Sequence, residues 1–430
     1  MAPLERVARN TLVQAGGHGF GLLVSVATTT MVARYLDVAS FGEYSLLAVV
    51  FALLTGVSTG SLESVAVREL AAQEEPEPGA FERLIGLRLA LSTALALLVL
   101  GVAFLVPLSG DLRLAVLLLA GVSVAGALQG TLVTVLQARL QFTLPAAVDV
   151  ATRVVMLAGY AAVLLWLVPP GEPRVAAAVA PLLLGTVFGA ALTWGILRRR
   201  GIRLGIAFDR VGWRRLAAET VPLAALQVLG IVNYRLDIVV LGALRGAEAA
   251  GIYGIAYRFV DAALPLAAFF AAALFPLLAR DTAGSAIRAQ RALTTVLLAV
   301  PFVVAPLVLL APVLVQIVGG GDYAPAALPL RILALSLPFS AVAMLLVSLV
   351  VARRRERAVL PLVVLSILLN LTLNLALVPA FGVAGSATAT LVSEAVGCAL
   401  LFRLVRRTLG ISFSLRPLLA PVASLRGRAA

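Results

Sequence analysis

Uninterrupted apolar stretches of about 20 residues or more recur along the whole sequence, and this feature limits the possible folds most strongly. A helix rises about 1.5 Å per residue, so each stretch is long enough to cross the roughly 30 Å hydrocarbon core of a membrane. Strands of a membrane barrel would instead alternate over about 10 residues. The sequence therefore predicts an all-α integral membrane protein of about twelve transmembrane helices, at residues 10–33, 42–62, 84–107, 112–136, 146–168, 175–197, 216–242, 249–278, 292–318, 326–351, 358–378 and 382–405.

The composition agrees with a membrane protein, and the arginines predict its orientation. Hydrophobic residues make up 61% of the chain and charged residues 13%, against about a quarter charged in soluble domains. Of the 34 basic residues, all of them arginine, 26 fall in connections on one side of the membrane and 5 on the other. The positive-inside rule then predicts that both termini lie in the cytoplasm. Topology and contact with lipid headgroups explain the net charge of +13, so no nucleic-acid partner is expected.

The richest basic connection divides the predicted helices into six and six. This segment, RRRGIRLGIAFDRVGWRR at residues 198–215, separates a lobe at 1–197 from a lobe at 216–407, and a cytoplasmic tail follows at 408–430. Short matches between the halves share an offset of 209 to 210 residues, as in FGEY at 41–44 and AGIY at 250–253. Six helices per half give both halves the same orientation, so we expect a pseudo-two-fold axis along the membrane normal.

Several longer segments resemble one known family. ARYLDVASFGEYSLLAVV, YRLDIVVLGALRGAEAAGIYGIAYRFVD and NLTLNLALVPAFGVAGSATATLVSE are similar to helices of polysaccharide-biosynthesis flippases in the multidrug/oligosaccharidyl-lipid/polysaccharide (MOP) exporter superfamily. The resemblance implies two six-helix lobes around a central cavity. It also implies export of undecaprenyl-pyrophosphate-linked oligosaccharide across a bacterial cytoplasmic membrane, by a transporter that is not an enzyme. The implied partners are lipid-linked oligosaccharide, membrane lipids, and the glycan polymerase and glycosyltransferases of the same pathway.

Polar side chains form stripes inside the predicted helices, because residues three and four apart share a helix face. Carboxylate, amide and hydroxyl oxygens are the ligands that a hard monovalent cation prefers. The pattern is similar to the sodium site of the related lipid II flippases, with Asn374 where those relatives are expected to have a second carboxylate. No cofactor is expected beyond sodium or a proton as the coupling ion. The alternative is hydrogen bonding between helices. The residues concerned are Asp237, Asn370, Asn374, Ser386 and Thr390.

Arginines at membrane depth suggest contact with the substrate's pyrophosphate, because a guanidinium offers paired donors and a permanent charge. Arg258 lies about nine residues into its predicted helix, and its alternative role is a local salt bridge with Asp261. Arg235 lies about 200° around the helix from Asp237, so we expect it to reach Glu394 or the cavity rim. The full set of residues predicted to contact substrate is Arg258, Arg235, Tyr234, Tyr257, Asp261, Glu394 and His18.

Three other functions compete with glycan export. A cation-coupled multidrug exporter and a lipid II flippase belong to the same superfamily. A membrane glycan polymerase would carry acids and bases in a sizeable loop at the membrane surface, whereas the outer loops predicted here are short. His18, the single histidine of the chain, is a second candidate for proton coupling, although a lone histidine among glycines more often serves packing.

Overall fold

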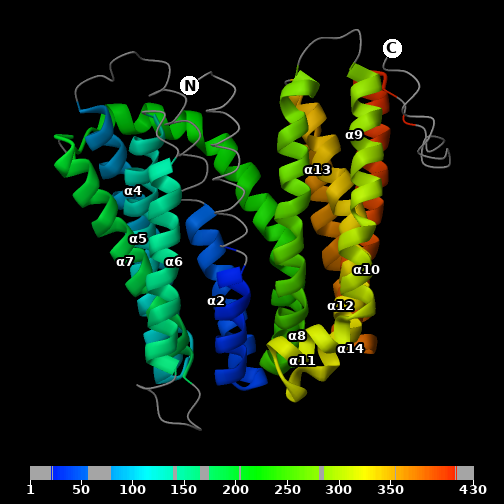
Figure 1. Cartoon of the computed structure of the whole chain (residues 1–430), viewed down its shortest axis with the longest axis horizontal. Coiled ribbons are helices and arrows are strands. Elements are labelled where there is room, and N and C mark those ends of the chain that lie inside the picture. Colours follow the sequence, from blue (N-terminus) through cyan, green and yellow to red (C-terminus); the bar gives the residue numbers. More distant parts are fainter. Residues whose placement is uncertain are drawn as a thin grey trace. The chain divides into compact units, whose positions relative to one another are not determined.

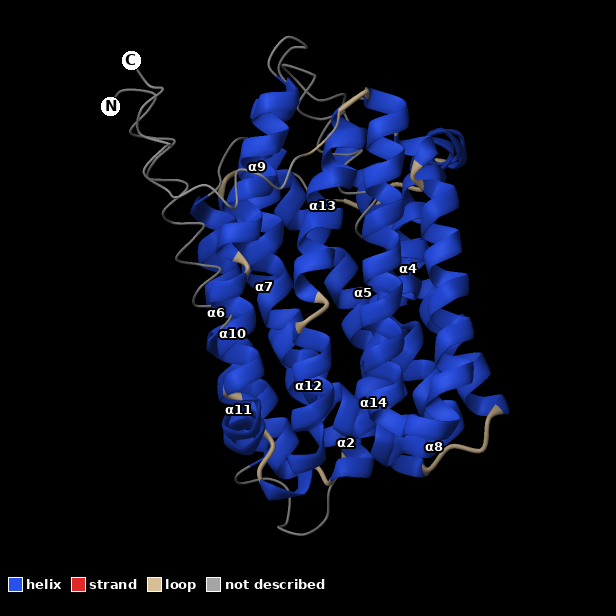
Figure 2. Ribbon diagram, turned by 90° about the vertical axis from the view of Figure 1, so that its right-hand side faces the viewer, coloured by secondary structure: helices blue, strands red, loops and turns tan. Residues whose placement is uncertain are grey.

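The computed structural model describes residues 21, 23–56, 79–138, 143–164, 174–202, 205–279, 285–353, 355–411 and 413. Every regular element within these ranges is a helix, as Figure 2 shows, which confirms the all-α fold class. The chain divides into two compact units, residues 1–232 and 233–430, which are described one at a time. His18 lies outside the described residues.

The first unit is a bundle built around α5. It comprises a helix at 23–35, α2 (Val38–Thr55), α4 (Ala80–Leu105), α5 (Gly110–Ala138), α6 (Thr143–Ala162) and α7 (Val175–Arg199). Helix α5 packs against α4 and α7, and α6 packs against α7 (Figure 1). Gly189 of α7 permits this close approach, because a Cβ there would lie 2.3 Å from Gln129 Nε2 and 2.5 Å from Thr152 Oγ1.

Side-chain carboxylates fix two helix starts in this unit. The side chain of Asp37 accepts the Ser40 amide at 2.7 Å and so caps α2. Asp111, at the start of α5, accepts the Val175 amide at 2.6 Å and the Ala176 amide at 3.3 Å. These amides belong to the first turn of α7, which has no partners for them within its own helix.

The basic segment at 198–215 contains the end of α7, a connection and the start of the next helix. The Ala207 amide donates to Glu82 O, and Trp213 Nε1 donates to Arg83 O, both at 3.0 Å, so this connection packs on α4. Arg88 is one of the 26 arginines counted in the connections, although it falls within the helix predicted at 84–107, and it lies two turns inside α4. It is fully buried there and donates to Thr131 Oγ1 at 3.2 Å.

Two long helices, each with one non-helical residue, lie wholly or largely in the second unit, and the earlier of them begins in the first unit. These are α8 (Arg210–Ala279), interrupted at Gly246, and α14 (Leu360–Leu409), interrupted at Gly382. In Figure 1, α12 and α13 lie against α14. The other elements between the two long helices are α9 (Ser285–Ala299), α10 (Pro301–Leu309), α11 (Ala311–Val318), η3 (Gly321–Ala326), α12 (Ala327–Ala334), α13 (Leu337–Ala352) and η4 (Glu356–Ala358).

Both long helices are hairpins whose arms run back along each other. Ser386 Oγ donates to Asn374 Oδ1 at 2.7 Å, whereas residues twelve apart in a straight helix would be about 18 Å apart. Tyr234 Oη likewise reaches Asp261 Oδ1 at 2.9 Å across 27 residues. The reversals occur at Gly246 (φ 84°, ψ 179°) and Gly382 (φ 56°, ψ −131°). Arg245 joins the two turns by donating to the carbonyls of Val378 and Pro379, which lie in the last turn of the first arm of α14, before Gly382.

Among the described residues, eight helices are long and apolar enough to cross a membrane, or nine if the bent pair Gly321–Ala334 and Leu337–Ala352 forms one span. Two of the eight, at 227–264 and 360–409, contain the hairpin turns, close to the predicted boundaries at 242–249 and 378–382. The number twelve and the two-fold relation between halves remain predictions, and the start of the first predicted helix lies outside the described residues.

We expect Gly246→Ala and Gly382→Ala each to lower the stability of the protein by about 1–3 kcal/mol. A Cβ at either position has nothing within 4 Å, so the cost comes from the positive φ alone. Thermal unfolding of the purified protein in detergent measures the effect. Gly101→Ala is the matched control, because Gly101 is helical and also has open space around its Cβ. Equal melting temperatures for all three variants would contradict the prediction.

Candidate functional site

A buried carboxylate lies between the two arms of α8 and the second arm of α14. Asp237 is 2% exposed. Its Oδ2 accepts hydrogen bonds from the hydroxyls of Tyr253 and Thr390, the latter at 3.0 Å, and its Oδ1 accepts the Ile238 amide at 2.8 Å. The hydroxyl oxygens of Tyr253 and Thr390 are also within hydrogen-bond distance of each other, at 3.2 Å. Asp237 therefore acts as an acceptor at both oxygens, surrounded by donors from two hairpins.

The network continues along α14 through side chains that face each other across its turn. Asn374 Nδ2 donates to Asn370 Oδ1 at 3.0 Å, and Asn374 Oδ1 accepts Ser386 Oγ at 2.7 Å. Asn370 Nδ2 donates to Ser393 Oγ at 3.1 Å, and Ser393 Oγ donates to Thr390 O at 3.0 Å. All of these side chains are buried. We call the set Asp237, Tyr253, Asn370, Asn374, Ser386, Thr390 and Ser393 the carboxylate network.

Five residues of this network belong to the polar stripes in the sequence, and their role as cation ligands stays a prediction. The structure brings together Asp237, Asn370, Asn374, Ser386 and Thr390, all five residues proposed as cation ligands. Hydrogen bonds between the helices, the alternative interpretation, are present for the same residues. Sequence analysis missed Tyr253 and Ser393 as members. A turn at Gly246 would have predicted Tyr253 as a neighbour of Asp237. Tyr253 lies seven residues after this glycine in the sequence and Asp237 nine residues before it, so the two face each other across the hairpin.

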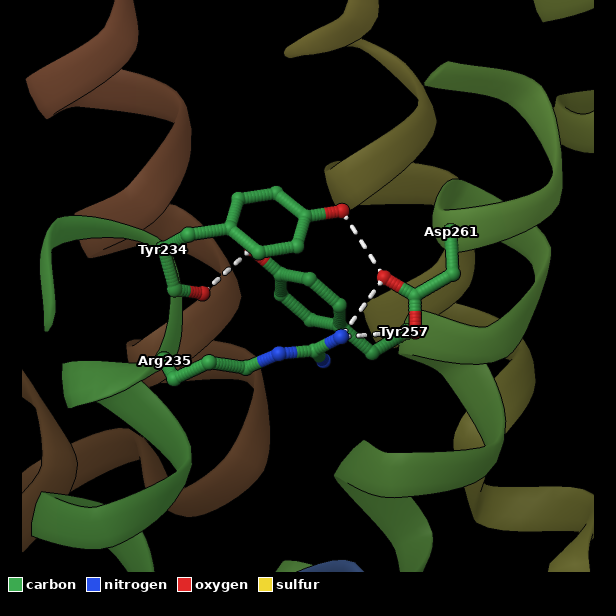
Figure 3. Close-up of polar contacts among 4 residues, drawn as sticks. All are labelled: Tyr234, Arg235, Tyr257 and Asp261. Atoms are coloured by element: carbon green, nitrogen blue, oxygen red, sulfur yellow. Dashed lines mark hydrogen bonds and ion pairs between the residues drawn. The ribbon is translucent and has the colours of Figure 1, made fainter. Parts of the chain in front are cut away.

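A second polar cluster lies between the two arms of α8, as Figure 3 shows. Arg235 Nη2 donates to both oxygens of Asp261, at 3.1 and 3.0 Å, and Tyr234 Oη donates to Oδ1 of the same carboxylate at 2.9 Å. Tyr257 Oη donates to the backbone carbonyl of Tyr234 at 3.0 Å. The four residues Tyr234, Arg235, Tyr257 and Asp261 form what we call the arginine cluster.

Two aromatic rings flank the guanidinium of Arg235. Its Cζ lies 4.9 Å from the ring centre of Tyr234 and 5.2 Å from that of Tyr257, and these two rings meet edge to face at 5.0 Å. Such contacts contribute about 0.5–2 kcal/mol each, and most where water is excluded. The side chains of Arg235 and Asp261 are 25% and 23% exposed, so the ion pair is partly open to its surroundings.

Arg235 and Asp237 point to different partners, as their positions about 200° apart on the helix predicted. Arg235 contacts the carboxylate of Asp261 and not the predicted Glu394. Glu394 instead accepts a hydrogen bond from Ser340 Oγ at 2.8 Å. The spacing of three residues predicted Arg258 as a partner of Asp261, and the structure shows that Arg235 pairs with it. Arg258 itself is half-buried on the second arm of α8.

With this geometry in place, the family can be assigned. The family model described as polysaccharide biosynthesis protein matches residues 7–281, well over half of the chain. The chain belongs to this family. Among curated proteins, no sequence matches it closely enough to count as a relative.

Solved structures of MOP superfamily transporters share the fold of this polysaccharide biosynthesis protein. The lipid II flippase MurJ in an inward closed conformation has a TM-score of 0.76 at 15% identity, over 96% of this chain and 89% of that one. An inward-facing MATE family multidrug resistance transporter has a TM-score of 0.71 at 14% identity, over 95% and 96%. A MOP superfamily transporter from Pyrococcus furiosus has a TM-score of 0.67 at 15% identity, over 94% and 95%. The chain is a multi-pass membrane protein with the MOP fold.

We expect Thr390→Val to lower the free energy of unfolding by about 1–2 kcal/mol, because Asp237 loses one of its donors at a buried site. Thr388→Val is the matched control two residues away. Its hydroxyl bonds only within its own helix, to Ala384 O at 2.8 Å, so its loss should cost far less. Denaturant titration of both variants in mixed micelles makes the comparison. Equal destabilisation would mean that the bond between Thr390 and Asp237 adds nothing.

Proposed function

We propose that this protein is a flippase that moves undecaprenyl-pyrophosphate-linked oligosaccharide from the inner to the outer leaflet of the bacterial cytoplasmic membrane. The match to the polysaccharide biosynthesis family over residues 7–281 carries the proposal. The structure named lipid II flippase MurJ, similar over nearly the whole chain, supports it. In the proposed cycle the substrate site opens to one side of the membrane and then to the other, by alternating access, and both termini face the cytoplasm. Glycosyltransferases and a glycan polymerase of the same pathway are the proposed partners.

Arginine side chains are the proposed contacts for the pyrophosphate, which is the most costly group to carry through hydrocarbon. Arg258 and Arg235 come from facing arms of α8 and are each partly exposed. Guanidinium groups remain charged and offer several donors in one plane, which suits phosphate oxygens. Tyr234, Tyr257, Asp261 and Glu394 are the other described residues proposed to line the cavity that holds the pyrophosphate and the glycan, and His18 remains a prediction.

A monovalent cation is proposed as a second substrate that supplies the driving force. The carboxylate network offers oxygen atoms of the type such a cation prefers. The amide oxygens of Asn370 and Asn374 accept hydrogen bonds in this structure, one of them from Ser386. A hydroxyl can rotate to present a lone pair, so Ser386 and Thr390 can turn toward a cation without helix movement. The residues therefore fit sodium, and a proton carried by Asp237 is the alternative.

A cation-coupled multidrug exporter is the second candidate function. The similarity to MATE transporter structures supports this candidate. Their TM-scores reach 0.71, close to the 0.76 of the lipid II flippase. The two functions differ in the charge of the substrate. A drug exporter that handles cations would gain nothing from arginines at membrane depth, whereas a pyrophosphate carrier needs them.

We expect Arg258→Ala to reduce glycan export about tenfold or more, because the pyrophosphate loses a charged and paired donor. Arg258→Lys keeps the charge but not the planar donors, so partial export should remain. The assay measures lipid-linked glycan that reaches the outer leaflet, with the membrane abundance of each variant measured in parallel. Arg331→Ala is the control, because Arg331 is exposed and donates to Val308 O at 3.1 Å. Full export by Arg258→Ala at normal abundance would refute the substrate role of Arg258.

Asp237→Asn should uncouple transport from the ion gradient. The substitution removes the one carboxylate of the proposed cation set and keeps its shape. Export into vesicles should then be the same with and without an imposed sodium or proton gradient, whereas the natural protein should respond to one of the two. Asp149→Asn serves as the control, since Asp149 is exposed and pairs with Arg153 at 2.8 Å. A full gradient response in Asp237→Asn would remove Asp237 from the coupling mechanism.

A further inference from the structure

The contact between Arg235 and Asp261 differs from an ordinary paired arginine in its geometry. Both hydrogen bonds to the carboxylate come from a single nitrogen, Nη2. The strongest arginine–carboxylate pairs use two parallel bonds from two nitrogens. Asp261 therefore uses only part of the fork of donors that Arg235 offers. A ligand with more oxygens, such as a phosphate, can use more of it.

The surroundings hold the guanidinium independently of Asp261. The rings of Tyr234 and Tyr257 lie 4.9 and 5.2 Å from Cζ of Arg235, and the Tyr257 hydroxyl is bonded to the Tyr234 carbonyl. These contacts would keep the cation in place if the carboxylate moved away. Asp261 also has a second donor, the Tyr234 hydroxyl at 2.9 Å, which stays with it over a small displacement. The arginine cluster thus holds the guanidinium of Arg235 in place, and the carboxylate of Asp261 is held partly by the neutral hydroxyl of Tyr234.

Asp261 can neutralise the charge of Arg235 when no substrate is bound. A guanidinium at membrane depth without a counter-ion is costly, so a carrier whose pyrophosphate has left needs another anion at the same place. About a quarter of each of the two side chains is exposed, which leaves room for an entering ligand to reach them. Arg153 and Asp149 form a pair of the same charges within one turn of α6, and that pair serves as a reference.

We propose that Asp261 is an internal counter-ion that occupies the phosphate subsite of Arg235 in the empty carrier, and that the diphosphate of a lipid substrate displaces it. This inference rests on the proposed function, because it assumes a diphosphate-bearing lipid as the substrate. The exchange of one anion for another keeps Arg235 neutralised in both the loaded and the empty states. It also lowers affinity, because the subsite is open only in the fraction of molecules in which Asp261 has moved away.

The test measures binding of farnesyl pyrophosphate to the purified full-length protein in lipid nanodiscs by isothermal titration. We expect Asp261→Asn to bind about tenfold more tightly than the natural protein, since the amide neither carries the competing charge nor closes the subsite. Asp261→Glu keeps the charge and should show no gain in affinity. Asp149→Asn, which removes the carboxylate of the reference pair, should leave the dissociation constant unchanged. The double variant Arg235→Gln with Asp261→Asn should lose the gain.

A second variant protects the test against poor folding of Asp261→Asn, which leaves Arg235 without its counter-ion. Tyr234→Phe removes one donor to Asp261 and leaves no charge unpaired, and we expect it to tighten binding about two- to threefold by favouring the open subsite. A purely structural ion pair predicts the opposite, namely weaker binding and a lower melting temperature for both variants.

The outcomes separate this proposal from the proposed function. If the natural protein binds farnesyl pyrophosphate in preference to farnesol, and neither Asp261→Asn nor Tyr234→Phe binds it more tightly, the counter-ion role of Asp261 is wrong and the proposed function stands. If the natural protein does not distinguish farnesyl pyrophosphate from farnesol, the diphosphate substrate itself is wrong, and the counter-ion role falls with it. Tighter binding by Asp261→Asn that disappears in the double variant supports both.

Discussion

Hydrocarbon supplies no hydrogen-bond partners, so each polar group that this chain carries into the membrane must find its partner within the protein. The backbone meets this requirement by forming helices. The side chains meet it through the two hairpins, whose reversals at Gly246 and Gly382 turn polar positions on one arm toward polar positions on the other. Asp237 meets Tyr253 across the first turn, and Asn374 meets Ser386 across the second. The position of each turn therefore determines which polar side chains become neighbours.

The separation of two charges on one helix follows from the same geometry. Arg235 and Asp237 are two residues apart, and a helix directs such side chains about 200° away from each other. The pair therefore does not neutralise itself. Asp237 faces hydroxyl donors and Arg235 faces a different carboxylate, Asp261. One short segment of α8 thus supplies a buried carboxylate to one cluster and a guanidinium to the other, and in the proposed function the first binds a cation and the second a phosphate.

The sequence predicted what depends on spacing along a single helix, and it failed where partners come from two helices. Hydropathy located the apolar helices, and the four-residue spacing of Asn370 with Asn374 and of Ser386 with Thr390 identified two faces of the carboxylate network. One of its two missed members, Tyr253, depends on the register across Gly246, which hydropathy does not specify. The prediction that Arg235 contacts Glu394 was wrong for the same reason, because its partner Asp261 lies on the other arm. Arg88 was misassigned to a connection because an arginine near a helix start resembles loop charge, whereas packing against α5 buries it.

The two clusters are joined by a direct contact between aromatic rings. Tyr253 belongs to the carboxylate network and Tyr257 to the arginine cluster, and their ring centres lie 5.4 Å apart, one helical turn along the same arm. Both clusters also hold the two arms of α8 together, one through Asp237 and the other through Asp261. A cation that takes Asp237 from Tyr253 would therefore alter the packing of Tyr257, whose ring flanks the guanidinium of Arg235. Coupling between an ion and an anionic substrate needs an element whose arrangement both ligands bias, and in the proposed function the α8 hairpin is that element.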